Sequence, residues 1–266
     1  IQEGVTSIGD CAFYNCTGLT SITIPDRVTS IGDSAFRNCT GLTSVTIPGS
    51  VTSIGECAFQ GCSSLTSIEI PSSVTSIGES TFSYTPWLTN KQNESPLVIV
   101  NGILIDGTTC SGEVTIPDGV TNIGNYTFRN CTGLTSIKIP KNVTSIGKNA
   151  FDGCTDLKEV LLENGSTLTS ESLGVDASII KTYWNEGNLT WTLDAEGTMT
   201  ISGSGEMKSY LIPDSPATQK KDSVKKVVIQ EGVTSIGDSA FESCTGLTSI
   251  NIPDGVTRIG SSAFFE

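Results

Sequence analysis

The sequence contains no histidine and little charge. Without histidine, His-ligated zinc sites and Ser-His-Asp or Cys-His catalytic groups are excluded. Charged residues make up 16% of the 266 residues, against roughly 25% in ordinary globular proteins. The formal net charge of −13 repels phosphate backbones, so we expect no nucleic-acid partner. No apolar run approaches the ~20 residues of a membrane span, so we expect no membrane insertion by this chain.

An internal repeat dominates what is present. The motif V-T-S-I-G-x-x-A-F-x-x-C-T-G-L-T-S-I-x-I-P begins at Val5 and returns after 23 residues at Val28 and again at Val51. Further copies begin at Val74, Val120, Val143, Val233 and Val256. Val74 and Val120 are two periods apart, so the register continues through a divergent copy. A fixed period of this length predicts a leucine-rich-repeat type solenoid, in which stacked repeats share one core.

Each repeat reads as a small α/β unit. In the copy at residues 28–50, the segment 33–39 follows Gly32 and carries Ala35, Phe36 and Cys39 at helical spacing. Residues 44–47 alternate as a strand and Pro48 ends it. We therefore expect an α/β repeat fold, with a short helix plus strands in every 23-residue repeat.

The fourth copy departs from the pattern after Phe82. Thr85-Pro86-Trp87-Leu88 replaces the usual Cys-Thr-Gly-Leu, and residues 89–95 read as a polar loop. Two β-rich triplets then flank Asn101-Gly102, a strong signal for a two-residue hairpin turn. We expect a β-hairpin insertion at about 89–112 in place of the usual short helix.

The repeat fades after Leu162 and gives way to a small all-β module. Residues 163–187 look irregular, whereas 189–193 and 198–202 alternate as paired strands and 224–229 as another strand. Residues 214–221 are polar and read as an exposed loop. We expect a first solenoid at 1–165, the module and its linker at 166–228, and the start of a second repeat block at 229–266.

The repeated string resembles the BspA-like leucine-rich-repeat family of bacterial surface proteins. The resemblance covers residues 1–88, 114–162 and 229–266, and the W-T-L-x-x-x-G-T-x-x-I-S-G-x-G segment resembles a β module of the same family. It implies a secreted or cell-surface location and an interaction role like that of the family's adhesins. It implies no catalytic motif and no cofactor.

The chain begins at Ile1, inside the repeat pattern. Residues 1–28 and 229–256 match at 23 of 28 positions, so a module plus a repeat block is itself duplicated. We interpret the chain as a piece of a longer secreted precursor. Both ends then expose core residues that a neighbouring repeat would cover, which makes end-to-end self-association an interaction to test.

Two polar columns follow from the period. Six cysteines share one repeat position: Cys16, Cys39, Cys62, Cys131, Cys154 and Cys244. Parallel side chains ~4.8 Å apart do not suit a disulfide, so we expect buried free thiols that act as small hydrophobes. Acids form the second column, at Asp10, Asp33, Glu56, Glu79 and Asp238. We expect them to begin the short helices; calcium binding is the alternative.

The strands also present variable outward positions. These are the candidate partner-binding residues: Thr23, Thr46, Glu69, Thr115, Lys138 and Asn251. Three aromatic residues that depart from the repeat pattern are further candidates: Tyr84, Tyr183 and Trp184. The sequence does not decide whether these three side chains are exposed or buried. For Trp87 and Trp191 we expect core positions.

The favoured function is a non-catalytic adhesin that binds a protein or glycan ligand through the solenoid face. A structural stalk that presents another domain is the alternative. A glycosidase is a remote third, because no nucleophile constellation can be recognised. A deep pocket with two carboxylates ~5–10 Å apart would support it.

Overall fold

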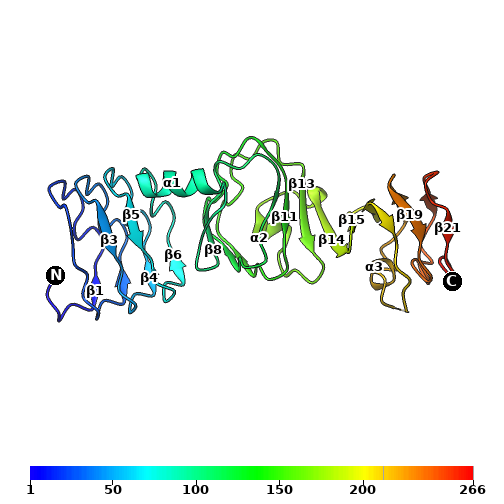
Figure 1. Ribbon diagram of the computed structural model, residues 1–266, viewed down its shortest axis with the longest axis horizontal. Coiled ribbons are helices and arrows are strands. Elements are labelled where there is room, and N and C mark those ends of the chain that lie inside the picture. Colours follow the sequence, from blue (N-terminus) through cyan, green and yellow to red (C-terminus); the bar gives the residue numbers. More distant parts are fainter. Residues whose placement is uncertain (212, 266) are drawn as a thin grey trace. The chain divides into compact units, whose positions relative to one another are not determined.

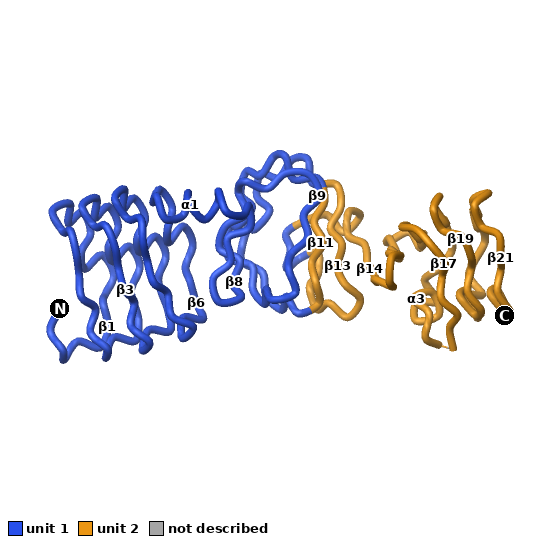
Figure 2. Tube along the Cα trace, viewed as in Figure 1, with its two compact units in different colours: residues 1–135, 142–157, 171–174 blue, residues 136–141, 158–170, 175–266 orange. Residues whose placement is uncertain are grey.

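The repeats form successive turns of a β-solenoid in the computed structural model, which describes residues 1–211 and 213–265 (Figure 1). The solenoid expected from the 23-residue period is therefore confirmed. The chain divides into two compact units (Figure 2). Unit 1 comprises residues 1–135, 142–157 and 171–174, and unit 2 comprises residues 136–141, 158–170 and 175–266.

In unit 1, the Ser-Ile dipeptide of each V-T-S-I motif forms a short strand, and these strands stack in parallel. Ser7 pairs with Ser30, Ser30 with Ser53, and Ser53 with Ser76, so the register advances by one repeat per strand. These four strands are β1 (Ser7–Ile8), β2 (Ser30–Ile31), β4 (Ser53–Ile54) and β6 (Ser76–Ile77). A second parallel pair joins β3 (Ser44–Thr46) to β5 (Ser67–Glu69).

The segment expected to be a short helix in each repeat is a series of turns instead. Ser34 and Asn38 have φ angles of 54° and 60°, which a right-handed helix cannot accommodate. The N–H groups of Ser34, Phe36 and Asn38 donate to carbonyls of the next repeat at 2.7–2.8 Å. A helix would use these donors internally, so stacking of the turns decides the local structure.

The predicted hairpin is confirmed. Strands β7 (Val98–Val100) and β8 (Ile103–Asp106) are antiparallel, and Asn101 and Gly102 both have positive φ, as a type I′ turn requires. Strand β8 also pairs in parallel with β10 (Asn122–Ile123), so it replaces the Ser-Ile strand of the divergent repeat. The remaining strands that lie wholly in unit 1 are β9 (Gly112–Thr115) and β12 (Ser145–Ile146).

The expected polar loop at 89–95 is wrong, because helix α1 spans Pro86–Glu94. Thr85 caps this helix by accepting the N–H of Leu88, and Pro86 occupies its first turn, where a missing N–H costs nothing. Trp87 and Leu88 are buried. They anchor an otherwise polar helix to the core of the fourth repeat.

Unit 2 contains a sheet with the strand order β20-β18-β16-β15-β14-β13-β11. Its strands are β11 (Leu134–Ile139), β13 (Glu159–Glu163), β14 (Ile180–Glu186), β15 (Leu189–Leu193), β16 (Thr198–Gly203), β18 (Lys226–Ile229) and β20 (Ser249–Asn251). The β14-β15-β16 meander is antiparallel, and it is flanked by parallel solenoid strands. A smaller parallel sheet joins β17 (Gly205–Glu206), β19 (Val233–Ile236) and β21 (Arg258–Ile259).

Two expectations about the residues that follow Leu162 are wrong. The segment 163–187 is not irregular, because it contains α2 (Ser170–Leu173), a 3₁₀ turn at Ala177–Ile179 and strand β14. The segment 214–221 is not an exposed loop, because it contains α3 (Pro216–Gln219). Ser215 caps α3 and is fully buried, and its hydroxyl donates to the Ala240 carbonyl at 2.6 Å.

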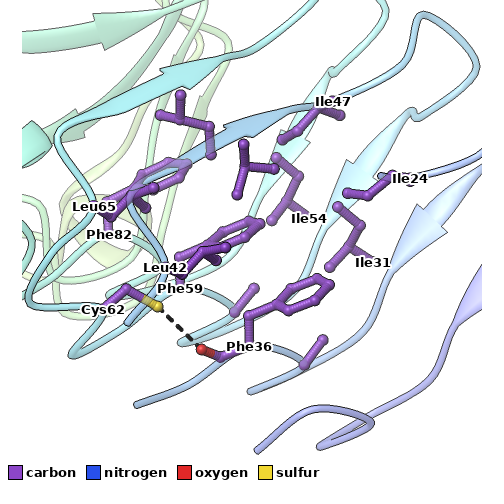
Figure 3. Close-up of a cluster of buried hydrophobic side chains, with 14 of the residues drawn as sticks. Ile24, Ile31, Phe36, Leu42, Ile47, Ile54, Phe59, Cys62, Leu65 and Phe82 are labelled. Atoms are coloured by element: carbon purple, nitrogen blue, oxygen red, sulfur yellow. Dashed lines mark hydrogen bonds between the residues drawn. The ribbon is translucent and has the colours of Figure 1, made fainter. Parts of the chain in front are cut away.

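The core of unit 1 is a stack of equivalent residues from successive turns. Figure 3 shows Phe36, Phe59 and Phe82 one above another. Ring centroids are 5.2 Å apart for Phe36 and Phe59, with planes within 8° of parallel. After Phe82 the stack ends against Trp87, whose ring is tilted by 55° at 4.6 Å. The insertion therefore interrupts the aromatic column.

Candidate interaction surface

The outward strand positions of unit 1 lie where the sequence places them. Thr23, Thr46, Glu69 and Thr115 are exposed, while their strand neighbours Val45 and Ile68 are buried. Thr46 on β3 lies directly opposite Glu69 on β5. The exposed side of this pair therefore presents small hydroxyl side chains and one carboxylate.

The two candidates in unit 2 have different surroundings. Lys138 is half-buried on β11; its ammonium donates to Asn185 Oδ1 at 2.8 Å and lies 4.2 Å from the centre of the Tyr183 ring. Burial lowers the pKa of Lys138. Asn251 is exposed on β20, in register with Val228. Lys138 is therefore already engaged within the sheet, whereas the Asn251 side chain faces solvent.

The three aromatic candidates separate into one exposed and two buried residues. Tyr84 is 82% exposed, whereas Tyr183 and Trp184 are 3% and 8% exposed. The indole N–H of Trp184 donates to Gln219 Oε1 at 3.4 Å. Of these three residues, Tyr84 alone can serve as an exposed aromatic contact. Trp87 and Trp191 are buried, as expected.

The acidic column connects neighbouring turns and does not begin helices. Asp10 Oδ1 accepts the N–H of Asp33 at 2.8 Å, and Asp33 Oδ1 accepts the N–H of Glu56 at the same distance. Asp238 Oδ1 likewise accepts the N–H of Ser261, and this bond lowers the pKa of Asp238. Within residues 1–211 and 213–265, no three His, Cys, Asp or Glu side chains come together as a metal site.

The cysteine column is mostly buried. All nine cysteines are free thiols. The Cys62 thiol donates to the Phe36 carbonyl of the previous turn at 3.1 Å (Figure 3), and burial raises its pKa to about 12. Cys39, Cys131 and Cys244 are also buried, Cys154 is partly buried, and Cys16 is exposed. The sulfur therefore fills the core and bonds to the adjacent turn.

A second surface in unit 1 was not singled out from the sequence. The Ser-Ile-Gly segments line an open depression of about 620 Å³, which includes Ser30, Ser53, Ser76 and Ser145. Their regular hydroxyls could have been found from the motif itself, because Ser precedes the buried Ile in almost every copy. The variable outward positions that the sequence indicated as candidate contacts lie on the other strand of the repeat.

The stacked parallel turns and shared core define a leucine-rich-repeat type solenoid. The sequence model of the BspA type leucine rich repeat region matches six copies, over residues 1–101, 106–182 and 215–266. The chain belongs to this family. Membership supports a surface-protein or interaction module in general terms.

Solved structures similar to this chain include a leucine rich cell surface protein from Faecalibacterium prausnitzii A2-165, at 27% identity and a TM-score of 0.38, covering 98% of this chain and 74% of that one. A leucine-rich repeat protein from Bacteroides ovatus ATCC 8483 is 22% identical, with a TM-score of 0.33 and coverages of 100% and 69%. The pneumococcal vaccine antigen PcpA is 14% identical, with a TM-score of 0.34 and coverages of 98% and 66%. A comparison with curated proteins found no match.

Within the described ranges, no helix has the length and apolar character needed to cross a bilayer.

Proposed function

We propose that the chain is a non-catalytic interaction module, secreted or held at the cell surface, that acts as an adhesin. The observation that carries this proposal is the exposed strand column of unit 1. Thr23, Thr46 and Glu69 face solvent at successive repeats above a fully packed core. Repeated small polar side chains on a rigid support suit many weak contacts with an extended protein or glycan, since linked contacts raise overall affinity.

A binding assay with matched variants tests this proposal. The folded chain is immobilised, and extracellular-matrix proteins and mucin glycans are passed over it. Thr23→Lys with Thr46→Lys places two bulky charges on the column. Ser7→Lys with Ser76→Lys adds the same charge at exposed positions on the other strands, β1 and β6. The proposal expects a saturable signal that only the first pair reduces, by about ten-fold (about 1.4 kcal/mol).

A stalk is the second candidate, and the hydrogen bonding between turns favours it. Thr29 Oγ1 donates to the Thr6 carbonyl and Thr52 Oγ1 to the Thr29 carbonyl, at 3.2 and 3.3 Å. These exposed hydroxyls are used by neighbouring turns, which stiffens the stack. If a folded, monomeric chain binds nothing in the panel, the stalk is the better proposal.

A further inference from the structure

Complete turns of unit 1 are joined by a regular main-chain ladder. The N–H groups of Cys57, Phe59 and Gly61 donate to carbonyls of the turn 22 residues further along the chain, at 2.8–2.9 Å. The donors alternate along the chain, as they do along one edge of a β-strand. Each turn therefore presents an edge that the next turn completes.

This ladder stops at the fourth repeat. The equivalent N–H groups of Ser80, Phe82 and Tyr84 donate to no atom within residues 1–211 and 213–265. Their neighbours Thr81 and Ser83 still accept bonds from the previous turn, so the turn itself is intact. The fourth repeat thus has an open edge in the middle of the unit.

The edge is open because the next repeat is too short. Leu104 and Val114 are ten residues apart, whereas the equivalent Ile31 and Val45 are fourteen apart. Strand β8 keeps its place beside β10, so the missing residues are those that would form the turn. This step of the stack is therefore incomplete: Gly107 keeps its central position, but flanking residues of the turn are absent.

The opposite wall has complementary atoms. In a complete stack, the carbonyls of Asn125, Thr127 and Arg129 would accept bonds from the preceding turn. Only Thr127 does so, from the Gly107 N–H at 2.8 Å. The carbonyls of Asn125 and Arg129 accept no bond from any residue that the structure describes. Donors on one wall therefore face acceptors on the other.

A cavity of about 290 Å³ lies between these walls and is lined by residues of both turns. Leu88 and Ile105 contribute apolar surface, and Glu79, Asp106 and Arg129 contribute charge. Ser80, Phe82 and Tyr84 all line the cavity, so it gives access to the unpaired edge of the fourth repeat. We call this cavity the open-rung slot.

We propose that the open-rung slot binds one extended segment of a partner polypeptide, which pairs with the open edge of the fourth repeat. The segment's carbonyls accept from the N–H groups of Ser80, Phe82 and Tyr84. Because Gly107 already occupies the place opposite Thr127, the segment's N–H groups donate to the carbonyl of Asn125 or of Arg129, on one side of Gly107. This is strand addition to an open edge, applied to a solenoid turn. Small side chains are preferred on the inner side, because Trp87 already covers Phe82. The proposal concerns a different surface from the strand column and does not depend on it.

The first test is amide hydrogen exchange of the unliganded chain by NMR. The structure predicts that Ser80, Phe82 and Tyr84 exchange at least ~100-fold faster than Cys57 and Phe59, which are hydrogen-bonded between turns. Equal protection at the two sets would show that the edge is closed and would overturn the proposal.

The second test is titration with the peptide acetyl-Ser-Ala-Ala-Ser-Asn-amide, followed through the same amides. Binding is expected to shift and protect Ser80, Phe82 and Tyr84. The same peptide N-methylated at alternate residues, which removes donors on one edge, is expected to bind at least ~10-fold more weakly. No binding, or equal binding of both peptides, refutes recognition through the main chain.

A matched pair of variants locates the site. Thr108 lines the slot, whereas its neighbour Thr109 is exposed and does not. Thr108→Trp is expected to abolish peptide binding and Thr109→Trp to preserve it. If Thr108→Trp unfolds the chain, the exchange and N-methyl experiments still decide the proposal. Loss of binding in both folded variants would contradict it.

Discussion

Removing one ring from the aromatic stack of unit 1 tests how the solenoid is stabilised. Phe59 is 0% exposed and lies between Phe36 and Phe82, with ring centroids 5.2 and 6.0 Å away. Phe59→Ala leaves a cavity with rings on both sides, and such core truncations cost ~3–5 kcal/mol. Phe13 is only partly buried and stacks on one side, against Phe36 at 5.1 Å. Phe13→Ala should therefore cost about half as much.

Urea unfolding followed by circular dichroism measures both free energies of unfolding. Phe59→Leu is the control, because it keeps most of the side-chain volume and should cost less than ~2 kcal/mol. Equal losses for Phe13→Ala and Phe59→Ala would refute the reasoning, because the loss would then not depend on flanking rings. A loss below ~1 kcal/mol for Phe59→Ala would mean that neighbouring turns close over the cavity.

Four further predictions concern the thiols, the hairpin and the last turn. In native protein at pH 8, Cys16 should react with a thiol reagent much faster than buried Cys62. Because burial raises the pKa of Cys62 from 9.0 to about 12, the contribution of Cys62 to the free energy of unfolding should be constant below pH 9 and fall as pH rises from 9 towards 12. Cys62→Ala should weaken the fall measured over that range, and an unchanged fall would contradict the prediction. Asn101→Ala should cost ~1–3 kcal/mol in urea unfolding, because its Nδ2 donates to the carbonyls of residues 71 and 74 at 2.8 and 2.9 Å. Ile259 and Phe265 are 54% and 64% exposed, so we expect end-to-end association of the chain. Light scattering should show a molecular mass that rises with protein concentration, and the double variant Ile259→Ser/Phe265→Ser should abolish this rise. A mass that stays constant with concentration in the unmodified chain would contradict the prediction.

The periodic part of the fold could be predicted from the sequence, because equivalent residues of successive repeats have the same structural environment. Val28, Ile31 and Phe36 recur with a fixed spacing and are all buried. The Asn101-Gly102 turn was also predictable, because few residues other than Asn and Gly accept positive φ at both positions. In both cases a local pattern determines the structure.

The expected helices failed for a physical reason. Ser34 and Cys57 have left-handed backbone conformations, each with a φ of 54°. Neither serine nor cysteine is typical of this conformation, so the sequence does not indicate it. Hydrogen bonds to the next turn, which are not local in sequence, compensate this conformation. Helix α1 was not predicted, although Thr85-Pro86 is typical of a helix N-terminus. The residues that follow Leu88 are polar and show no apolar helical spacing, so they were interpreted as a loop.

The candidate surface was predictable only in its regular part. Alternation correctly placed Thr46 and Glu69 outside. It could not decide the burial of Tyr183 and Trp184, which depends on how the meander packs. The open-rung slot was missed because its only signal is a length, the short interval between Leu104 and Val114.

Repetition itself limits where a specific ligand can bind. In a regular turn, Asp33 and Asn38 both bond to their counterparts in adjacent repeats, so polar groups that could recognise a ligand are already used. Such a surface offers the same weak contact in every repeat, so its affinity for a ligand comes from the number of contacts made at once. Selectivity requires groups that the repeat leaves unpaired, and a repeat shortened between two complete ones leaves main-chain donors on one side and acceptors on the other. In this chain the interruption beside Ser80 and Phe82 offers main-chain bonds for affinity, and the side chains that line the open-rung slot, such as Leu88 and Arg129, are where a partner sequence could be distinguished.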